Sequence, residues 1–81
     1  MNREDLKAII IGIASEVFLV NKELINNEDF MRGDIEEWDS LGHIKLFLAL
    51  EKKLKIKFST EDILKLDSVK KITDKSLELF A

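Results

Sequence analysis

The sequence predicts an all-α fold: a single domain over residues 1–81, forming a four-helix bundle with a long loop between helices 1 and 2 and a short third helix. The chain contains no proline and only three glycines, so few residues interrupt a helix. No stretch alternates apolar and polar residues as a half-buried strand does. Apolar residues make up 46% of the chain and charged residues 36%, which is typical of one folded globular domain.

Composition excludes several classes of site. The sequence has no cysteine and a single histidine, His43, which excludes disulfides, thiolate–metal sites and zinc motifs built on histidine pairs. The net charge of −3 does not provide the excess of basic residues that binds nucleic acid. That charge is uneven, because residues 1–41 hold four basic and ten acidic residues whereas residues 42–81 hold nine basic and six acidic ones. We expect no metal site and no binding of nucleic acid.

The first helix is expected to follow Asn2, which can cap it, with Asp5 as a weak capping-box partner. Its apolar residues recur at helical spacing and form one stripe: Leu6, Ile9, Ile10, Ile13 and Val17. A secretory signal is the alternative, but acidic residues offset the basic flank and Glu16 ends the apolar run early. The run is also too short to cross a membrane. We therefore expect no membrane span and a cytoplasmic location.

The segment 21–39 loses the helical periodicity. Asn26, Asn27, Gly33 and several acidic residues break it, and a loop of this length is usually functional or disordered. Isolated apolar residues recur through the segment and can anchor it: Leu24, Ile25, Phe30, Ile35 and Trp38. We predict an ordered crossing between two helices, with room for a short helical turn, in which Trp38 packs against the bundle.

Three more helices are predicted. The second begins at Ser40, a favoured N-cap residue, and runs to about Lys55. After a connector over residues 56–59, Ser59 or Thr60 caps a short third helix over residues 61–66. Asp67 or Ser68 then caps the last helix. Its inward face is predicted to hold Val69, Ile72, Leu79 and Phe80.

The second helix has two apolar faces. Leu46, Phe47, Leu50 and Leu54 form the expected core stripe. Leu41, Ile44 and Leu48 form another stripe on a different face, flanked by Lys45 and Lys52. This second stripe is either buried under the long loop or exposed as a docking patch for partner proteins, and both interpretations stay open here.

The segment 37–44, Glu-Trp-Asp-Ser-Leu-Gly-His-Ile, is the most informative in the chain. It puts the hydroxyl of Ser40 where a long loop meets a helix N-terminus. Unpaired backbone N–H groups and the helix dipole favour a phosphate at such a point. A phosphodiester on Ser40 would therefore be stabilised by the backbone.

Asp39-Ser40-Leu41 opening a helix of the form Ile-Lys-Leu-Phe-Leu-Ala-Leu-Glu resembles the signature of acyl carrier proteins, the phosphopantetheine-binding carriers, in their stand-alone form. Later segments over residues 56–58, 60–62 and 67–69, and residues 27–30 upstream, are also similar to that family. The triplet alone is a weak signal, whereas the triplet, helix pattern, spacing and length together are a strong one. The resemblance covers nearly the whole chain and implies the four-helix carrier fold.

The resemblance implies a carrier rather than an enzyme. Ser40 would receive 4′-phosphopantetheine from coenzyme A through a separate phosphopantetheinyl transferase, with Asp39 and Leu41 helping the transferase to recognise the site. The thiol of the arm would hold acyl groups as thioesters for a loading enzyme and for downstream pathway enzymes, the protein being a monomer. Partner docking would involve Leu41, Ile44, Lys45, Leu48 and Lys52. An aminoacyl or peptidyl carrier is the alternative within the class.

Some of these residues also have a purely structural interpretation. Ser40 could act only as an N-cap, as Ser68 is expected to do in the second Asp-Ser-apolar triplet. His43 is expected to be a partly buried polar residue near the arm. A helical interaction module is the alternative from a different class. The sequence disfavours an esterase built on Ser40 and His43, because Trp38 stands where a nucleophile elbow needs glycine.

The second helix departs from familiar fatty-acid carriers, which are strongly acidic there. Gly42, Lys45, Lys52 and Lys53 stand where such carriers often have acids. Charge complementarity governs encounter and rejects wrong partners. We hypothesise that this chain serves a dedicated biosynthetic pathway rather than general fatty-acid synthesis.

Overall fold

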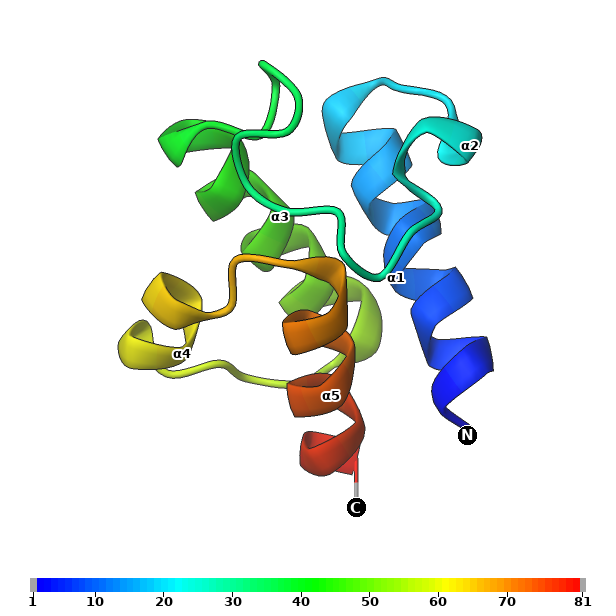
Figure 1. Ribbon diagram of the computed structural model, residues 1–81. Helices are drawn as coiled ribbons and strands as arrows, with labels where there is room; N and C mark the ends of the chain where they lie inside the picture. Colours follow the sequence, from blue (N-terminus) through cyan, green and yellow to red (C-terminus); the bar gives the residue numbers. More distant parts are fainter. Residues whose placement is uncertain (1, 81) are drawn as a thin grey trace.

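The computed structural model describes residues 2–80 and confirms the all-α prediction (Figure 1). Within that range the helices are α1 (Arg3–Phe18), α2 (Lys22–Ile25), α3 (Ser40–Leu54), α4 (Thr60–Lys65) and α5 (Val69–Phe80). No strand occurs among these residues, only an isolated bridge between Met31 and Ser68. The four-residue α2 is the predicted helical turn inside the long crossing. No helix between residues 2 and 80 is long and apolar enough to cross a membrane.

Local capping explains where α1 begins and ends. The side chain of Asn2 accepts a hydrogen bond from the backbone N–H of Asp5 (2.8 Å), as predicted for an N-cap. Leu19 ends the helix in the left-handed region, with φ of 56°. Figure 1 shows that α1 begins and α5 ends at the same end of the bundle.

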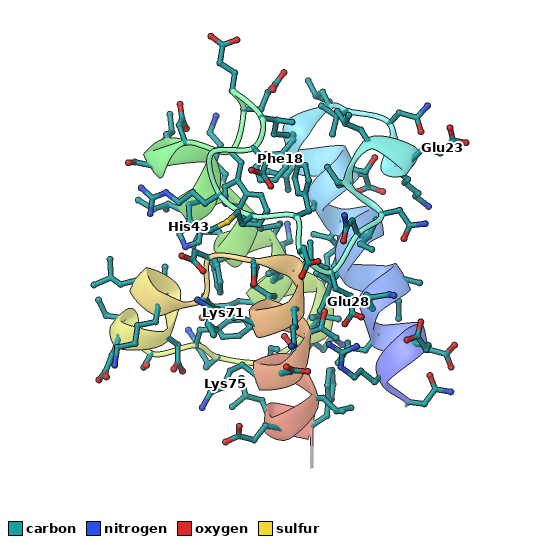
Figure 2. The ribbon with its side chains drawn as sticks, viewed as in Figure 1. Phe18, Glu23, Glu28, His43, Lys71 and Lys75 are labelled. Carbon is teal, nitrogen blue, oxygen red and sulfur yellow. The ribbon has the colours of Figure 1, made fainter. Side chains whose placement is uncertain are left out.

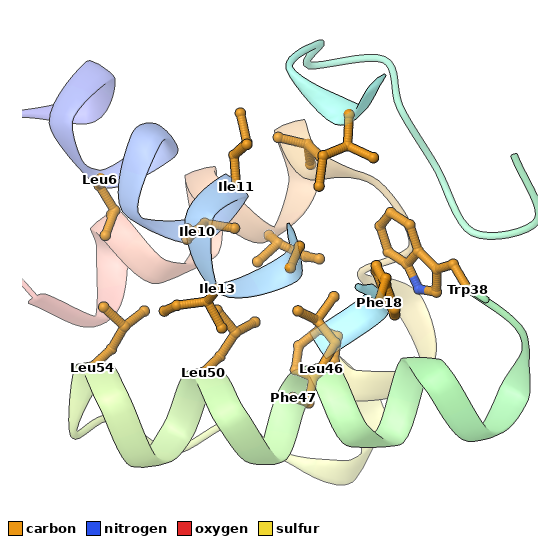
Figure 3. Packing of buried hydrophobic residues seen from close by; sticks show 14 of the residues in the cluster. Leu6, Ile10, Ile11, Ile13, Phe18, Trp38, Leu46, Phe47, Leu50 and Leu54 are labelled. Carbon is orange, nitrogen blue, oxygen red and sulfur yellow. The ribbon is translucent and has the colours of Figure 1, made fainter. Parts of the chain in front are cut away.

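The core lies where α1 packs against α3 and α5. Figure 3 shows Leu6, Ile10 and Ile13 of α1 facing the row of apolar side chains on α3. All four members of the predicted α3 core stripe are buried: Leu46, Phe47, Leu50 and Leu54. Removing this apolar surface from water is the main stabilising term of the bundle.

The stripe predicted on α1 is partly wrong. Ile9 is exposed, whereas Ile11 is buried together with Ala14 and Phe18. The reason is that α2 packs on α1 in addition to α3 and α5, so α1 is covered on more than one side. A stripe argument assumes a single buried face and misses the second one.

The inward face of α5 also differs from the prediction. Val69 and Ile72 are buried as expected, but Leu79 and Phe80 are 37% and 44% exposed. The face instead continues through Thr73 and Ser76, which are fully buried and complete an i, i+3, i+4, i+7 row. In Figure 1 the last turn of α5 lies at the end of the bundle, where fewer elements surround it.

α4 is the least buried helix. The side chain of Ser59 and the carboxylate of Asp62 form a capping box at its start, and none of its residues is buried. Lys75 extends from α5 toward it (Figure 2), with its Nζ 3.9 Å from the Asp62 carboxylate. Ser68 accepts from the Lys71 N–H at the start of α5, as expected for a cap.

Arg3 ties α1 to two other parts of the fold. Its guanidinium pairs with Asp74 of α5 (2.8 Å) and with Glu28 of the crossing segment (2.5 Å). Figure 2 shows Glu28 beside α1. The hydrogen bonds that Arg3 donates to Asp74 and, to a lesser extent, to Glu28 hold the pKa of Arg3 above its ordinary value.

Candidate functional site

Ser40 is the first residue of α3, and its side chain is exposed. The N-cap is Asp39, whose carboxylate accepts a hydrogen bond from the Gly42 N–H (2.8 Å). The interpretation of Ser40 as merely the helix cap is therefore wrong, because the cap position lies one residue earlier. The Ser40 hydroxyl makes no hydrogen bond to the helix backbone within residues 2–80.

A second side chain reaches Ser40 from the crossing segment. Arg32 Nη2 donates a hydrogen bond to Ser40 Oγ at 2.7 Å. The backbone of Arg32 is held in turn, since its N–H donates to the carbonyl of Asp67 at 2.8 Å. Sequence reasoning missed Arg32, because nothing in a loop sequence indicates which of its residues will return to a helix eight positions later.

The crossing segment closes just before the site. Gly33 adopts φ of 96°, a region that favours glycine, and its N–H donates to the Trp38 carbonyl at 3.0 Å. Trp38 is 1% exposed and packs against Phe18 and Phe30, with ring centroids 5.5 and 5.8 Å away. The prediction that Trp38 anchors the loop is confirmed.

His43 is buried rather than partly buried, with 2% of its surface exposed. Its Nδ1 accepts a hydrogen bond from Trp38 Nε1 (2.9 Å), so the ring proton is on Nε2, which lies 2.5 Å from the carbonyl oxygen of Ile63. Both ring nitrogens are used inside the protein. His43 therefore links the crossing segment, α3 and α4, and its role is structural.

Gly42 marks the closest approach of the crossing segment to α3. A Cβ built on Gly42 would lie 2.0 Å from the backbone carbonyl oxygen of Glu37. Only a residue without a side chain fits there. The sequence did carry a signal for this contact, since a glycine inside an otherwise good helix usually has a packing reason.

The second apolar stripe of α3 is exposed and is not buried under the crossing segment. Leu41, Ile44 and Leu48 are 60%, 52% and 62% exposed. Lys45 and Lys52, at helical spacing along the same side, are exposed as well. Exposed leucines and isoleucines that line up on one helix are unusual on a monomer surface.

A groove runs beside that stripe, between α3 and α4. It has a volume of about 260 Å³ and is lined by Ile44, Phe47, Leu48, Glu51, Thr60, Ile63 and Leu64. Leu64 of α4 is 69% exposed, so it extends the apolar surface across the groove. Apolar concave surfaces of this kind suit an apolar ligand or a partner side chain.

Charge around Ser40 is mostly negative. The segment 34–39 contains Asp34, Glu36, Glu37 and Asp39, and the basic residues that flank Ser40 along the chain are Arg32 and Lys45. Two of these acids are engaged with backbone donors: Asp34 accepts from the Met31 N–H and Asp39 from the Gly42 N–H. Among residues 2–80 no group of three or more histidine or acidic side chains could hold a metal ion.

No protein-family model matches the chain, and no curated protein matches it.

Proposed function

We propose that the chain is an acyl carrier protein whose Ser40 carries 4′-phosphopantetheine. The observation that carries the proposal is the state of the Ser40 hydroxyl. Ser40 is exposed and is the first residue of α3. The N-cap hydrogen bond is made by Asp39, so the Ser40 hydroxyl is not needed for it. A hydroxyl in this position can attack a phosphate that the transferase brings to it.

The fold supports the proposal in its order of elements. α1, α3, α4 and α5 would be the four helices of a carrier, with α2 as a turn within the long crossing. The protein itself would perform no catalysis. It would supply a tether and a docking face, and the thiol of the arm would hold acyl intermediates for separate enzymes.

The exposed stripe of Leu41, Ile44 and Leu48 is the proposed docking face, and it begins one residue from the attachment site. A partner bound there would have the arm within reach. Lys45 and Lys52 border the stripe, so a partner with acidic residues around an apolar patch fits it best. The basic residues beside the stripe support a role in a dedicated biosynthetic pathway. Efficient elongation of an acyl group on this protein by the enzymes of general fatty-acid synthesis would contradict that role.

Intact-protein mass spectrometry after co-expression with a broad-specificity phosphopantetheinyl transferase tests the proposal. Wild type is expected to gain the mass of one phosphopantetheine, and Ser40→Ala is expected to gain none. Ser68→Ala is the matched control, because Ser68 belongs to the second Asp-Ser-apolar triplet and caps α5. Loss of modification in Ser68→Ala but not in Ser40→Ala would show that Ser68, and not Ser40, is the attachment site.

A helical interaction module is the second candidate, favoured by the exposed stripe and the groove beside it. Such a module would need no modification of Ser40. Wild type that gains no mass while remaining folded would support this candidate and contradict the carrier. An aminoacyl carrier would be modified in the same way and is separated from an acyl carrier only by its loading enzyme.

A further inference from the structure

We infer that Arg32 binds the phosphate of the arm on Ser40 and positions Ser40 Oγ for modification. This inference rests on the proposed function and adds a residue to its site. It starts from the hydrogen bond of 2.7 Å that Arg32 Nη2 donates to Ser40 Oγ. A group bonded to that oxygen would lie beside the remaining donors of the guanidinium.

Arg32 has no carboxylate partner, although acids surround it in sequence. None of the acidic side chains between residues 2 and 80 lies within ion-pair distance of its guanidinium. The other arginine of the chain, Arg3, pairs with two carboxylates. Arg32 thus forms no ion pair within residues 2–80, and its guanidinium donates instead to the one oxygen proposed to gain a phosphate.

The backbone holds Arg32 in place. The Arg32 N–H donates to the Asp67 carbonyl, and two residues earlier the Phe30 carbonyl accepts from the Val69 N–H at 2.9 Å. On the other side, Gly33 N–H donates to the Trp38 carbonyl. These bonds fix the segment between the start of α5 and the start of α3. A fixed backbone reduces the conformational freedom that has to be lost when the guanidinium binds an anion.

The chemistry of the transfer uses that charge. Ser40 Oγ attacks the phosphorus that carries the pantetheine half of coenzyme A, and an Oγ–P bond forms. The P–O bond to the nucleotide half breaks, adenosine 3′,5′-bisphosphate leaves, and the hydroxyl proton passes to the transferase or to solvent. The product is a phosphodiester whose negative charge stays on Ser40. Arginine is suited to it, because its planar fork offers two parallel donors to the oxygens of one phosphate.

The experiment uses purified full-length protein, a purified transferase and coenzyme A. Arg32→Gln is expected to lower kcat for modification about tenfold, the size of one lost charge-assisted hydrogen bond, with KM for the carrier changing little. Arg32→Lys keeps the charge without the fork and is expected to recover part of the rate. Arg3→Gln is the matched control; it removes the other arginine, at the distant end of α1, and is expected to leave the rate unchanged.

A second readout reports the finished phosphodiester directly. In the modified protein the ³¹P resonance is expected to shift in Arg32→Gln relative to wild type and to stay in place in Arg3→Gln. Thermal unfolding confirms that each variant is folded before its rate is compared. An unchanged rate and an unchanged ³¹P resonance in Arg32→Gln overturn the role of Arg32 and leave the carrier proposal intact. Absence of modification in wild type overturns both.

Discussion

The α1–α3–α5 core and the crossing segment 26–39 are stabilised in different ways. In the core, many buried apolar side chains contribute to stability, so no single contact is decisive. The crossing segment has no regular secondary structure and depends on a few specific contacts, chiefly Trp38, Gly33 and the close approach at Gly42. The crossing segment is also what places Arg32 and Asp39 at Ser40. The segment that forms the site is therefore held by fewer stabilising contacts than the core.

Replacing Trp38 with alanine is expected to give the largest effect. The change empties a buried site between Phe18 and Phe30 and removes the donor to His43, with a loss of about 3–5 kcal/mol in the free energy of unfolding. Urea unfolding followed by circular dichroism measures it. Leu50→Ala in the core is the reference, with an expected loss of about 2–5 kcal/mol. A loss below 1 kcal/mol for Trp38→Ala would contradict the anchoring role described above.

Replacing His43 with leucine tests the hydrogen bonds that link Trp38 to the rest of the fold through His43. The apolar volume is largely kept, but Trp38 Nε1–H and the Ile63 carbonyl lose their partner, at about 1–3 kcal/mol for each group left unsatisfied. Trp38 is the only tryptophan, so its fluorescence reports the crossing segment directly. A red shift of its emission is expected together with the loss of stability. An unchanged emission spectrum would mean that the ring of Trp38 does not depend on His43.

Replacing Gly42 with alanine tests the close approach. The added methyl group would overlap the Glu37 carbonyl, so the segment before Ser40 has to move, at about 1–3 kcal/mol despite the better helix propensity of alanine. Gly12→Ala is the matched control within α1. Its Cβ would meet only the flexible end of Lys22 at 3.7 Å, and a gain of up to about 1 kcal/mol is expected. Equal effects of the two substitutions on thermal stability would show that the approach at Gly42 is not tight.

The smallest effect is expected in the core, at Ser76 of α5. Its hydroxyl is fully buried and has no hydrogen-bond partner within residues 2–80, so Ser76→Ala is expected to stabilise the protein by about 1 kcal/mol. Thr73→Val provides the contrast. Thr73 Oγ1 donates to the Val69 carbonyl at 2.7 Å, and losing that bond removes any gain. Destabilisation by Ser76→Ala in chemical denaturation would indicate that its hydroxyl does have a partner.

Local pattern predicted the helices well and their buried faces less well. The caps at Asn2 and Ser59, the start of α3 and the core stripe from Leu46 to Leu54 follow from residue type and helical spacing. The face of α5 was predicted from hydrophobicity, which favoured Leu79 and Phe80. Position within the bundle decides burial, and polar residues can occupy an inward row when it lies against another helix.

The sequence by itself determined the helical class, the order and approximate bounds of the helices, the anchoring role of Trp38, and Ser40 as the candidate site. These depend on spacing along one chain, on capping chemistry and on a short motif. The tertiary structure decided that the stripe from Leu41 to Leu48 is exposed and that Arg32 reaches Ser40. Those facts depend on how a segment without periodic pattern folds back on the bundle, and such contacts are set by packing between distant residues rather than by any local preference.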